Sequence, residues 1–248
     1  MTGELGSFGV GAETNPGSFG VGAETNPGSF GVGAETNRVG GDRPLIAVLD
    51  YRIGNLHSAQ KALEKCGADA RLTADAGLIR DSAGVVLPGV GAFGACMDAL
   101  RGAGLENDAH ASVASGRPFL GICVGMQMLF TRSEESNDAT GLGVIDGTVA
   151  WIPAGPKIPQ MQWNRLQIRR DDPMFAGLGD DAWVYFVHSL HGVPDDPEVV
   201  AATVEYGTTI NAAFRSGNVF AAQFHPEKSS RPGLRLLENF VDICRDAA

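Results

Sequence analysis

The 248-residue sequence lacks an apolar run of the roughly 20 residues that a membrane-spanning helix needs. Its N-terminus also lacks a basic segment followed by an apolar core, which is the pattern of a secretory signal. These two absences predict a protein of the cytoplasm with no membrane partner.

Basic residues are scarce. The chain has 19 Lys and Arg residues against 29 Asp and Glu residues, for a formal net charge of −10. Binding to a phosphate backbone needs a concentrated basic face. Nucleic acid is therefore not an expected partner.

Cysteine is scarce as well, and its spacing is uninformative for metals. The four cysteines lie far apart, without a Cys-x-x-Cys pair and without matching histidines: Cys66, Cys96, Cys123 and Cys244. This pattern indicates neither a zinc site nor a disulfide framework. We expect no metal and no cofactor, and we expect three of the four thiols to be inert core groups.

The first part of the chain is repetitive. Residues 6–37 repeat an eleven-residue unit that begins at Gly6, Gly17 and Gly28, and each copy carries only Phe and Val as sizeable apolar groups. So little apolar surface cannot offset the entropy cost of ordering the chain. Residues 1–43 are predicted to be a disordered tail, with a short glycine-rich binding arm as the alternative.

Residues 44–248 are predicted to form one α/β domain. Strand patterns at residues 45–50, 68–72, 84–88 and 118–123 alternate with helix patterns at residues 55–65, 92–101 and 107–115. This rhythm predicts a mostly parallel sheet that is flanked by helices, with a ligand site at the carboxyl ends of its strands.

The second half of this domain has shorter segments separated by Gly, Pro and Asp. Residues 143–151, 183–187, 199–205 and 212–224 are predicted to be mostly antiparallel strands that extend the same sheet. Residues 232–245 carry apolar side chains at helical spacing and are predicted to form a closing amphipathic helix.

The segment around Cys123 has the pattern of a nucleophile elbow. Gly121-Ile122-Cys123-Val124-Gly125 lies between the apolar residues 118–120 and a helix-like stretch at residues 126–130. Such a turn is tight, so its flanking positions must lack side chains if the thiol is to stand above the sheet edge. Cys123 is the candidate nucleophile, and a buried structural thiol is the alternative.

A cysteine nucleophile needs a base, and the base needs a group that orients it. His225 and Glu227 directly follow the strand pattern of residues 219–224. In an extended segment, residues two apart point to the same side, so both side chains are predicted to face one pocket, with Pro226 stiffening the link. A solvated surface pair is the alternative.

The glycine-rich turn at residues 88–93 follows the third predicted strand. Backbone N–H groups of Val90 and Gly91, together with that of Val124, could stabilise an oxyanion there. A plain tight connection is the alternative. A phosphate-binding loop is disfavoured because no Gly-Lys-Ser/Thr follows.

The glycine-rich turn of residues 88–93, Cys123 and the His225-x-Glu227 motif follow one another along the chain. In this order of motifs the sequence resembles the class I (triad) glutamine amidotransferases. The resemblance implies an α/β domain that hydrolyses the glutamine amide through a γ-glutamyl thioester and passes ammonia to a synthase site. It makes Cys123 the nucleophile, His225 the general acid and base, and Glu227 its orienting partner. It also implies that glutamine is held by Gln127 and by the backbone near Gly91 and Ser189, although Gln127 could be only a polar residue of an early helix turn.

Within this class the motifs are most similar to the glutaminase subunits of imidazole glycerol phosphate synthases. The motifs are Asp50-Tyr51 with Gly54-Asn55, residues 88–93, residues 121–127, Trp163-Asn164, residues 185–189 and residues 224–229. This resemblance implies a heterodimer with a separate (β/α)₈ cyclase subunit, which uses the ammonia in histidine biosynthesis. A glutaminase of the anthranilate or aminodeoxychorismate type, or a non-catalytic binding subunit, are the alternatives.

Three residues depart from the pattern of this family. Arg52 stands where a glycine is usual, Gln162 also replaces a glycine, and Leu190 replaces a tyrosine. Arg52 would place a bulky cation near the mouth of the site. These departures leave the partner interface and the basal activity open. His188 fits equally a functional residue and a histidine with satisfied hydrogen bonds at a strand end.

Overall fold

The computed structural model describes residues 43–154 and 156–248. The predicted repeat tail of residues 1–43 lies outside the described residues except for Arg43, so its predicted disorder stays a prediction. Among the described residues, no helix is long and apolar enough to cross a membrane.

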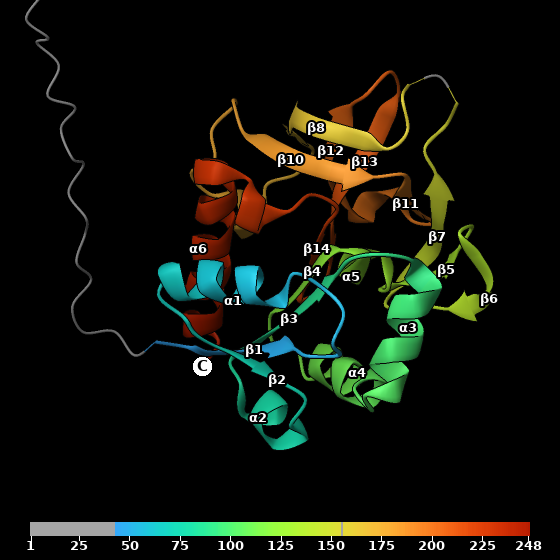
Figure 1. The fold of residues 1–248 in the computed structure, drawn as a ribbon. Helices are drawn as coiled ribbons and strands as arrows, with labels where there is room; N and C mark the ends of the chain where they lie inside the picture. The colour runs from blue at the N-terminus through green and yellow to red at the C-terminus, as the bar shows by residue number, and fades with distance from the viewer. Residues whose placement is uncertain (1–42, 155) are drawn as a thin grey trace, which may run out of the picture. The chain divides into compact units, whose positions relative to one another are not determined.

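The central sheet has eight strands in the order β2-β1-β3-β4-β14-β13-β12-β9 (Figure 1). Its first five strands run parallel, and the last three pair antiparallel. Their bounds are Asp69–Thr73, Leu45–Leu49, Gly84–Gly89, Phe119–Cys123, Val219–Ala222, Thr209–Ser216, Val200–Glu205 and Gln167–Ile168 in that order. The predicted α/β class with an antiparallel extension is confirmed.

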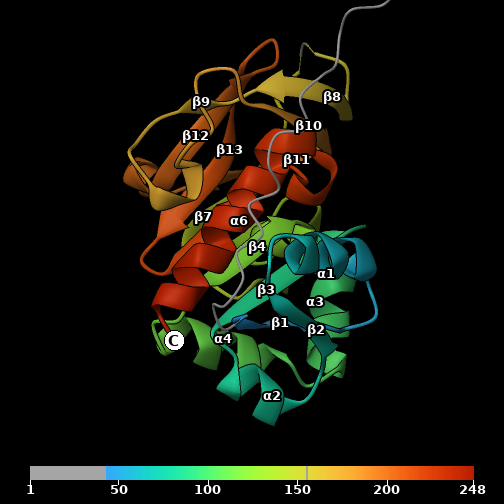
Figure 2. The ribbon, with the colours of Figure 1, turned by 90° about the vertical axis from the view of Figure 1, so that its left-hand side faces the viewer.

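Helices cover both faces of the parallel strands. Figure 1 shows α1 (Leu56–Lys65) above β1 and α2 (Ala76–Asp81) below it. The closing helix α6 (Ser230–Asp246) packs against α1 and crosses in front of the central strands in Figure 2. Its buried residues recur at helical spacing, which is the apolar stripe that the sequence predicts. The remaining longer helices are α3 (Phe93–Gly102) and α4 (Glu106–Ala114).

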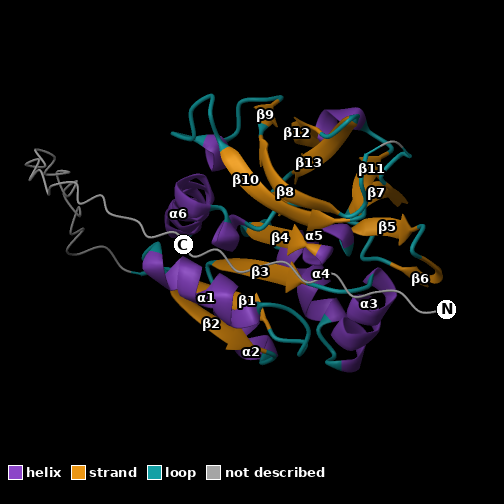
Figure 3. Cartoon of the chain, turned by 45° about the horizontal axis from the view of Figure 1, so that its top comes forward, coloured by secondary structure: helices purple, strands orange, loops and turns teal. Residues whose placement is uncertain are grey.

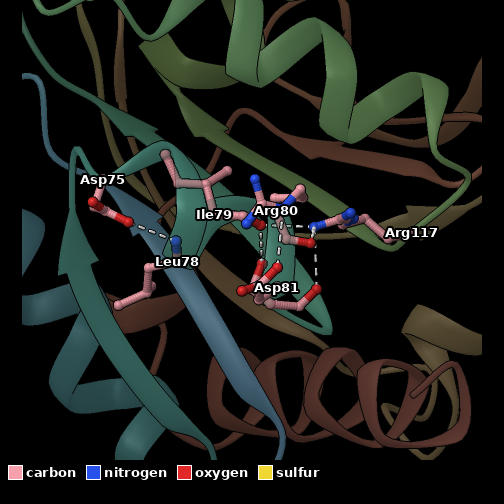
Figure 4. Close-up of polar contacts among 7 residues, drawn as sticks. Asp75, Leu78, Ile79, Arg80, Asp81 and Arg117 are labelled. Carbon is pink, nitrogen blue, oxygen red and sulfur yellow. Dashed lines mark hydrogen bonds and ion pairs between the residues drawn. The ribbon is translucent and has the colours of Figure 1, made fainter.

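Helix α2 is absent from the sequence prediction because it is short and buries only Ile79. The Asp75 side chain caps it by accepting a hydrogen bond from the Leu78 N–H at 2.7 Å. At its other end, Arg117 donates to the carbonyls of Ile79 and Arg80 at 2.7 and 2.6 Å (Figure 4). The helix end is therefore held by a side chain from a distant segment, which no local pattern reveals.

Two predicted strands do not extend the central sheet. β7 (Ile145–Trp151) belongs to a four-stranded sheet of order β11-β7-β5-β6, whose other strands are Leu190–Pro194, Phe130–Ser133 and Ser136–Thr140. β10 (Trp183–His188) pairs only with β8 (Gln160–Arg165), as a two-stranded ribbon that Figure 3 shows above β4. In β10, buried residues alternate with more exposed ones. One side of the strand therefore packs on the domain and the other side faces solvent, unlike a central strand that is buried on both sides.

Two further boundaries differ from the prediction. The predicted helix at residues 126–130 is the single turn α5 (Val124–Gln127), after which Phe130 already starts β5. The predicted strand of residues 212–224 is the hairpin of β13 and β14, which turns at Gly217 with φ +55°. Glycine takes this conformation without strain, and β14 (Val219–Ala222) lies within the strand pattern of residues 219–224.

The four-stranded sheet is fastened to the central sheet by aromatic packing. Phe130 of β5 and Phe214 of β13 meet edge to face, with ring centroids 5.2 Å apart. Gly192 of β11 leaves room for both rings, since a Cβ there would lie within 2.7 Å of Phe214. The carbonyl of Leu190, the first residue of β11, accepts a hydrogen bond from Gln127 shortly after β4, so β11 begins near the carboxyl end of β4.

Candidate active site

Cys123 ends β4 and lies in a strained turn. Its φ is +56°, a region that residues other than glycine rarely adopt. The flanking glycines explain how the turn closes: a Cβ at Gly125 would overlap the Leu87 carbonyl of β3, and a Cβ at Gly121 would lie 2.8 Å from Leu129. The geometry is that of the predicted elbow, with Cys123 at the carboxyl end of the central strand β4.

His225 and Glu227 meet directly, but not through an extended segment. The imidazole Nδ1 lies 2.8 Å from the Glu227 carboxylate, and both side chains are only 3% exposed. Pro226–Lys228 forms a 3₁₀ turn, so the prediction that the two side chains align along a strand is wrong. The turn is fastened by Ser229, whose hydroxyl donates to the His225 carbonyl at 2.6 Å and accepts from the Tyr185 N–H at 2.9 Å.

The electrostatics of His225 favour its protonated form. Burial lowers the pKa of the imidazole, but hydrogen bonds and charge interactions with Cys123 and Glu227 outweigh burial and raise the pKa to about 9. His225 therefore carries its second proton at neutral pH. A protonated imidazole beside the sulfur is the ion-pair arrangement in which cysteine acts as a nucleophile.

One cavity of about 320 Å³ collects nearly all the predicted site residues. Its lining includes Val90, Gly91, Cys123, Val124, Gln127, Ser189 and His225. Glu227 stands behind His225 and does not line the cavity. The volume suits a ligand of amino-acid size at the small end of protein pockets.

Gln127 lines this cavity and forms a buried amide pair with Gln223, which does not line it. The Gln127 amide nitrogen donates to the Gln223 side-chain oxygen at 3.1 Å and to the Leu190 carbonyl at 3.3 Å, which leaves Oε1 of Gln127 to accept from a ligand. The Gln223 amide nitrogen lies 3.8 Å from the Cys123 sulfur. Sequence reasoning missed Gln223, although a glutamine inside the apolar strand pattern of residues 219–224 was an available signal.

Glu135 is a second residue that sequence reasoning missed. It lines the same cavity, and its carboxylate accepts the Phe93 N–H at 2.6 Å, at the start of α3. A carboxylate on the cavity wall can bind an ammonium group. No sequence pattern indicated this role, because Glu135 lies in an acidic surface turn between β5 and β6.

His188 and Arg52 have different surroundings. The two ring nitrogens of His188 face oxygen atoms: Nδ1 lies 2.7 Å from the Leu190 carbonyl oxygen, and Nε2 lies 2.8 Å from Oε1 of Gln160. Burial lowers the pKa of His188 to about 4, so the ring is neutral and its single N–H can donate to only one of these two oxygens. Arg52 is exposed, has φ +67° and does not line the cavity. The expected cation at the mouth of the site is therefore not part of the cavity wall.

Within residues 43–154 and 156–248, no group of three or more His, Cys, Asp or Glu side chains could hold a metal ion.

Comparison with known proteins gives a consistent result. The model of the family described as "Glutamine amidotransferase class-I" matches residues 47–244. The imidazole glycerol phosphate synthase subunit HisH of Syntrophotalea carbinolica is 48% identical over 206 residues, which cover 80% of this chain and 100% of that protein. The HisH subunit of Synechococcus elongatus is 50% identical over 202 residues, or 80% and 93% of the two chains. The fold is also similar to that of PurLQS from Thermotoga maritima, with a TM-score of 0.62, 21% identity and coverage of 81% and 98%.

Proposed function

Because the chain belongs to the class I glutamine amidotransferase family, and within it to the HisH subunits of imidazole glycerol phosphate synthase, we propose that Cys123, His225 and Glu227 form its catalytic triad. The chain is a glutaminase subunit that acts in histidine biosynthesis. The anthranilate-type alternative loses its support, since the relatives named above are HisH subunits.

The observation that carries the triad assignment is the convergence of sulfur and charged imidazole on one cavity. The Cys123 thiolate attacks the carboxamide carbon of glutamine, and the carbonyl electrons move to the oxygen. The backbone N–H groups of Gly91 and Val124 receive this oxyanion. As the tetrahedral intermediate collapses, the C–N bond breaks and His225 gives its proton to the departing nitrogen, which leaves as ammonia.

The second half of the cycle frees the enzyme. The now neutral His225 takes a proton from water, whose oxygen attacks the γ-glutamyl thioester. The C–S bond breaks, glutamate leaves, and the thiolate with its imidazolium partner is restored. Glu227 holds the Nδ1 proton throughout, so that Nε2 is the nitrogen that exchanges protons near the sulfur.

Glutamine recognition is assigned to groups on the cavity wall. The Glu135 carboxylate suits the α-ammonium group, and Oε1 of Gln127 can accept a hydrogen bond from the substrate. The backbone at Gly91 and Ser189 completes the wall. These groups fit the amino-acid end of glutamine while Cys123 faces the side-chain amide.

Ammonia released into water near neutral pH becomes ammonium, which is not a nucleophile, so a covered route to a second active site is useful. A partner that docks on the outer face of the β8/β10 ribbon would cover such a route. This outer face consists of Met161, Trp163, Trp183, Tyr185 and Val187, with Met161 60%, Trp163 43% and Trp183 46% exposed, and we call it the docking face. Val187 also lines the catalytic cavity, so the docking face continues to the cavity mouth. We assign this face to the cyclase subunit of a heterodimer.

The docking face gives a testable prediction. Trp163→Glu should raise the dissociation constant for the cyclase by about 30-fold or more, because it places a charge at the centre of an apolar contact. Titration of labelled cyclase measures the binding, and glutamate release measures the activity. Wild-type glutamate release should rise when the cyclase is added, and this rise should disappear in the variant at equal concentrations.

Ile168→Glu is the matched control for Trp163→Glu. Ile168 is 41% exposed, close to the exposure of Trp163, but it lies on β9 at the far edge of the central sheet. Equal weakening by both substitutions would argue against the docking face.

The raised pKa of His225 predicts the alkaline limit of glutaminase activity. Below about pH 9 the imidazole holds the proton that the leaving nitrogen needs, so kcat/KM for glutamine should fall as the pH rises through about 9. Glu227→Gln removes a negative charge that raises this pKa. The alkaline limb should then move to lower pH, and kcat/KM at pH 7 should fall roughly 10- to 100-fold.

The measurement is kcat/KM against pH for both forms of the complex. A variant that loses activity equally at every pH, with no movement of the limb, would contradict the role given to Glu227.

A further inference from the structure

The turn after β3 lies between the catalytic cavity and the core. Val90 and Gly91 line the cavity on one side. On the other side lies Cys96 of α3, which is fully buried and does not line the cavity. The turn itself is open: Gly91 has φ +94°, and a Cβ there would meet nothing within 4 Å. In the direction of a Cβ at Gly91, therefore, no neighbouring group constrains this peptide.

A hydrogen bond holds it instead. The Cys96 thiol donates to the Val90 carbonyl, with the sulfur 3.2 Å from the oxygen. Among the described residues, Ile158-Pro159 is the only cis peptide, so the Val90-Gly91 peptide is trans. In a trans peptide the C=O and the following N–H point to opposite sides of the chain. With the carbonyl turned to Cys96 in the core, the Gly91 N–H points away from the core, toward the cavity.

The donor groups around the turn keep their protons at neutral pH. Burial raises the pKa of the Cys96 thiol to about 11, so the sulfur remains a donor and is not a nucleophile. The Tyr51 hydroxyl donates to the Pro88 carbonyl at 2.5 Å, two residues earlier, and burial raises its pKa as well. Two buried donors thus hold alternate carbonyls of the same turn.

We propose that Cys96 is a positioning residue for the glutaminase reaction, which fixes the oxyanion-binding direction of the Gly91 N–H by holding the Val90 carbonyl from the core side. The inference rests on the proposed function, because it needs an oxyanion at Cys123. It assigns a role to a thiol that the cysteine pattern predicts to be inert. Cys96 touches no reacting atom and acts only through the turn.

The test uses the full chain in complex with its cyclase and compares two substitutions. Cys96→Ala removes the donor, and Cys96→Ser keeps a donor of similar size. Loss of a whole oxyanion donor costs about 10²–10³ in rate, so loss of the bond that orients one should lower kcat for glutamine by about 10-fold. KM should stay within about twofold of wild type, and Cys96→Ser should retain most of kcat.

A transition-state analogue separates positioning from packing. The Cys123 sulfur adds to the aldehyde carbon of glutamate γ-semialdehyde, and the carbonyl electrons move to the oxygen, which then occupies the oxyanion position without a leaving group. The inhibition constant of this aldehyde should rise by about 10-fold in Cys96→Ala, in step with kcat. If Cys96→Ala loosened the core in general, the KM for glutamine would rise as well.

Cys66→Ala is the matched control. The Cys66 thiol also donates to a backbone carbonyl, that of Leu234 at 3.6 Å, but Leu234 does not line the cavity, whereas Val90 does. This variant should keep wild-type kcat and aldehyde inhibition. If Cys96→Ala does not fold, Cys96→Val fills the same space without a donor and should show the same loss.

Three results would overturn the inference alone, given an active wild-type complex. They are unchanged kcat and aldehyde inhibition in Cys96→Ala, equal losses in the Ser and Ala variants, or a loss that appears in KM and not in kcat. A wild-type complex that releases no glutamate would overturn the proposed function together with the inference.

Discussion

Cys123→Ala should abolish glutamine-dependent product formation by the reconstituted complex, by a factor of at least about 10⁴, and leave ammonia-dependent formation intact. The nucleophile forms the thioester, and no other side chain on the cavity wall can replace it. Free ammonia bypasses this step, because it needs only the partner's active site. Product formation is measured with glutamine and then with an ammonium salt at alkaline pH.

Cys66→Ala provides the control, since it removes a half-buried thiol outside the cavity. It should leave both activities at the wild-type level. Equal loss of glutamine-dependent and ammonia-dependent synthesis in Cys123→Ala would contradict the role assigned to Cys123. Full retention of glutamine-dependent synthesis would favour a non-catalytic binding subunit.

Gly125→Ala should destabilise the domain by about 3 kcal/mol and lower glutaminase activity by about 100-fold or more. The new methyl group would overlap the Leu87 carbonyl, which belongs to the backbone of β3 and cannot rotate away. Either β3 or the elbow must move. Movement of the elbow displaces the Cys123 sulfur and the Val124 N–H together, so activity falls along with stability.

Denaturant unfolding and glutamate release measure the two effects of Gly125→Ala. Gly102→Ala, at the end of α3, is the control, because a Cβ there would meet nothing within 4 Å. Alanine at this position should be neutral or slightly stabilising. Similar unfolding midpoints for both variants would show that the elbow tolerates a side chain at position 125.

Local periodicity accounts for the part of the fold that was predictable. Strands β1, β3 and β4 are continuous apolar runs, and α6 carries an apolar stripe, so their patterns can be read without knowing their neighbours. The partner with which each strand pairs cannot be read from its own pattern. Nothing in residues 183–187 distinguishes a strand of the central sheet from one of a two-stranded ribbon, because the choice depends on which surface covers its buried side.

The site residues also divide into those that a local pattern indicates and those that it does not. Cys123 and His225 were visible because glycine spacing and strand ends are local features. Gln223 and Glu135 were not identified, since each reaches the site from a segment distant in the chain. Cys96 bonds Val90 only six residues away, but the cysteine spacing does not indicate that bond. Gln223 contacts Cys123 across 100 residues, and Glu135 reaches α3 across 42.

The sequence by itself determined a strained turn with a thiol at its apex, a base beside a carboxylate after a later strand, and alternating strands and helices. These follow from steric rules that act within a few residues. The tertiary structure decided how they meet. Because β14 pairs beside β4, the end of one strand brings His225 and Gln223 to the sulfur at the end of the other. The pairing of β14 with β4 depends on strand order and on packing between distant segments, which no local spacing encodes.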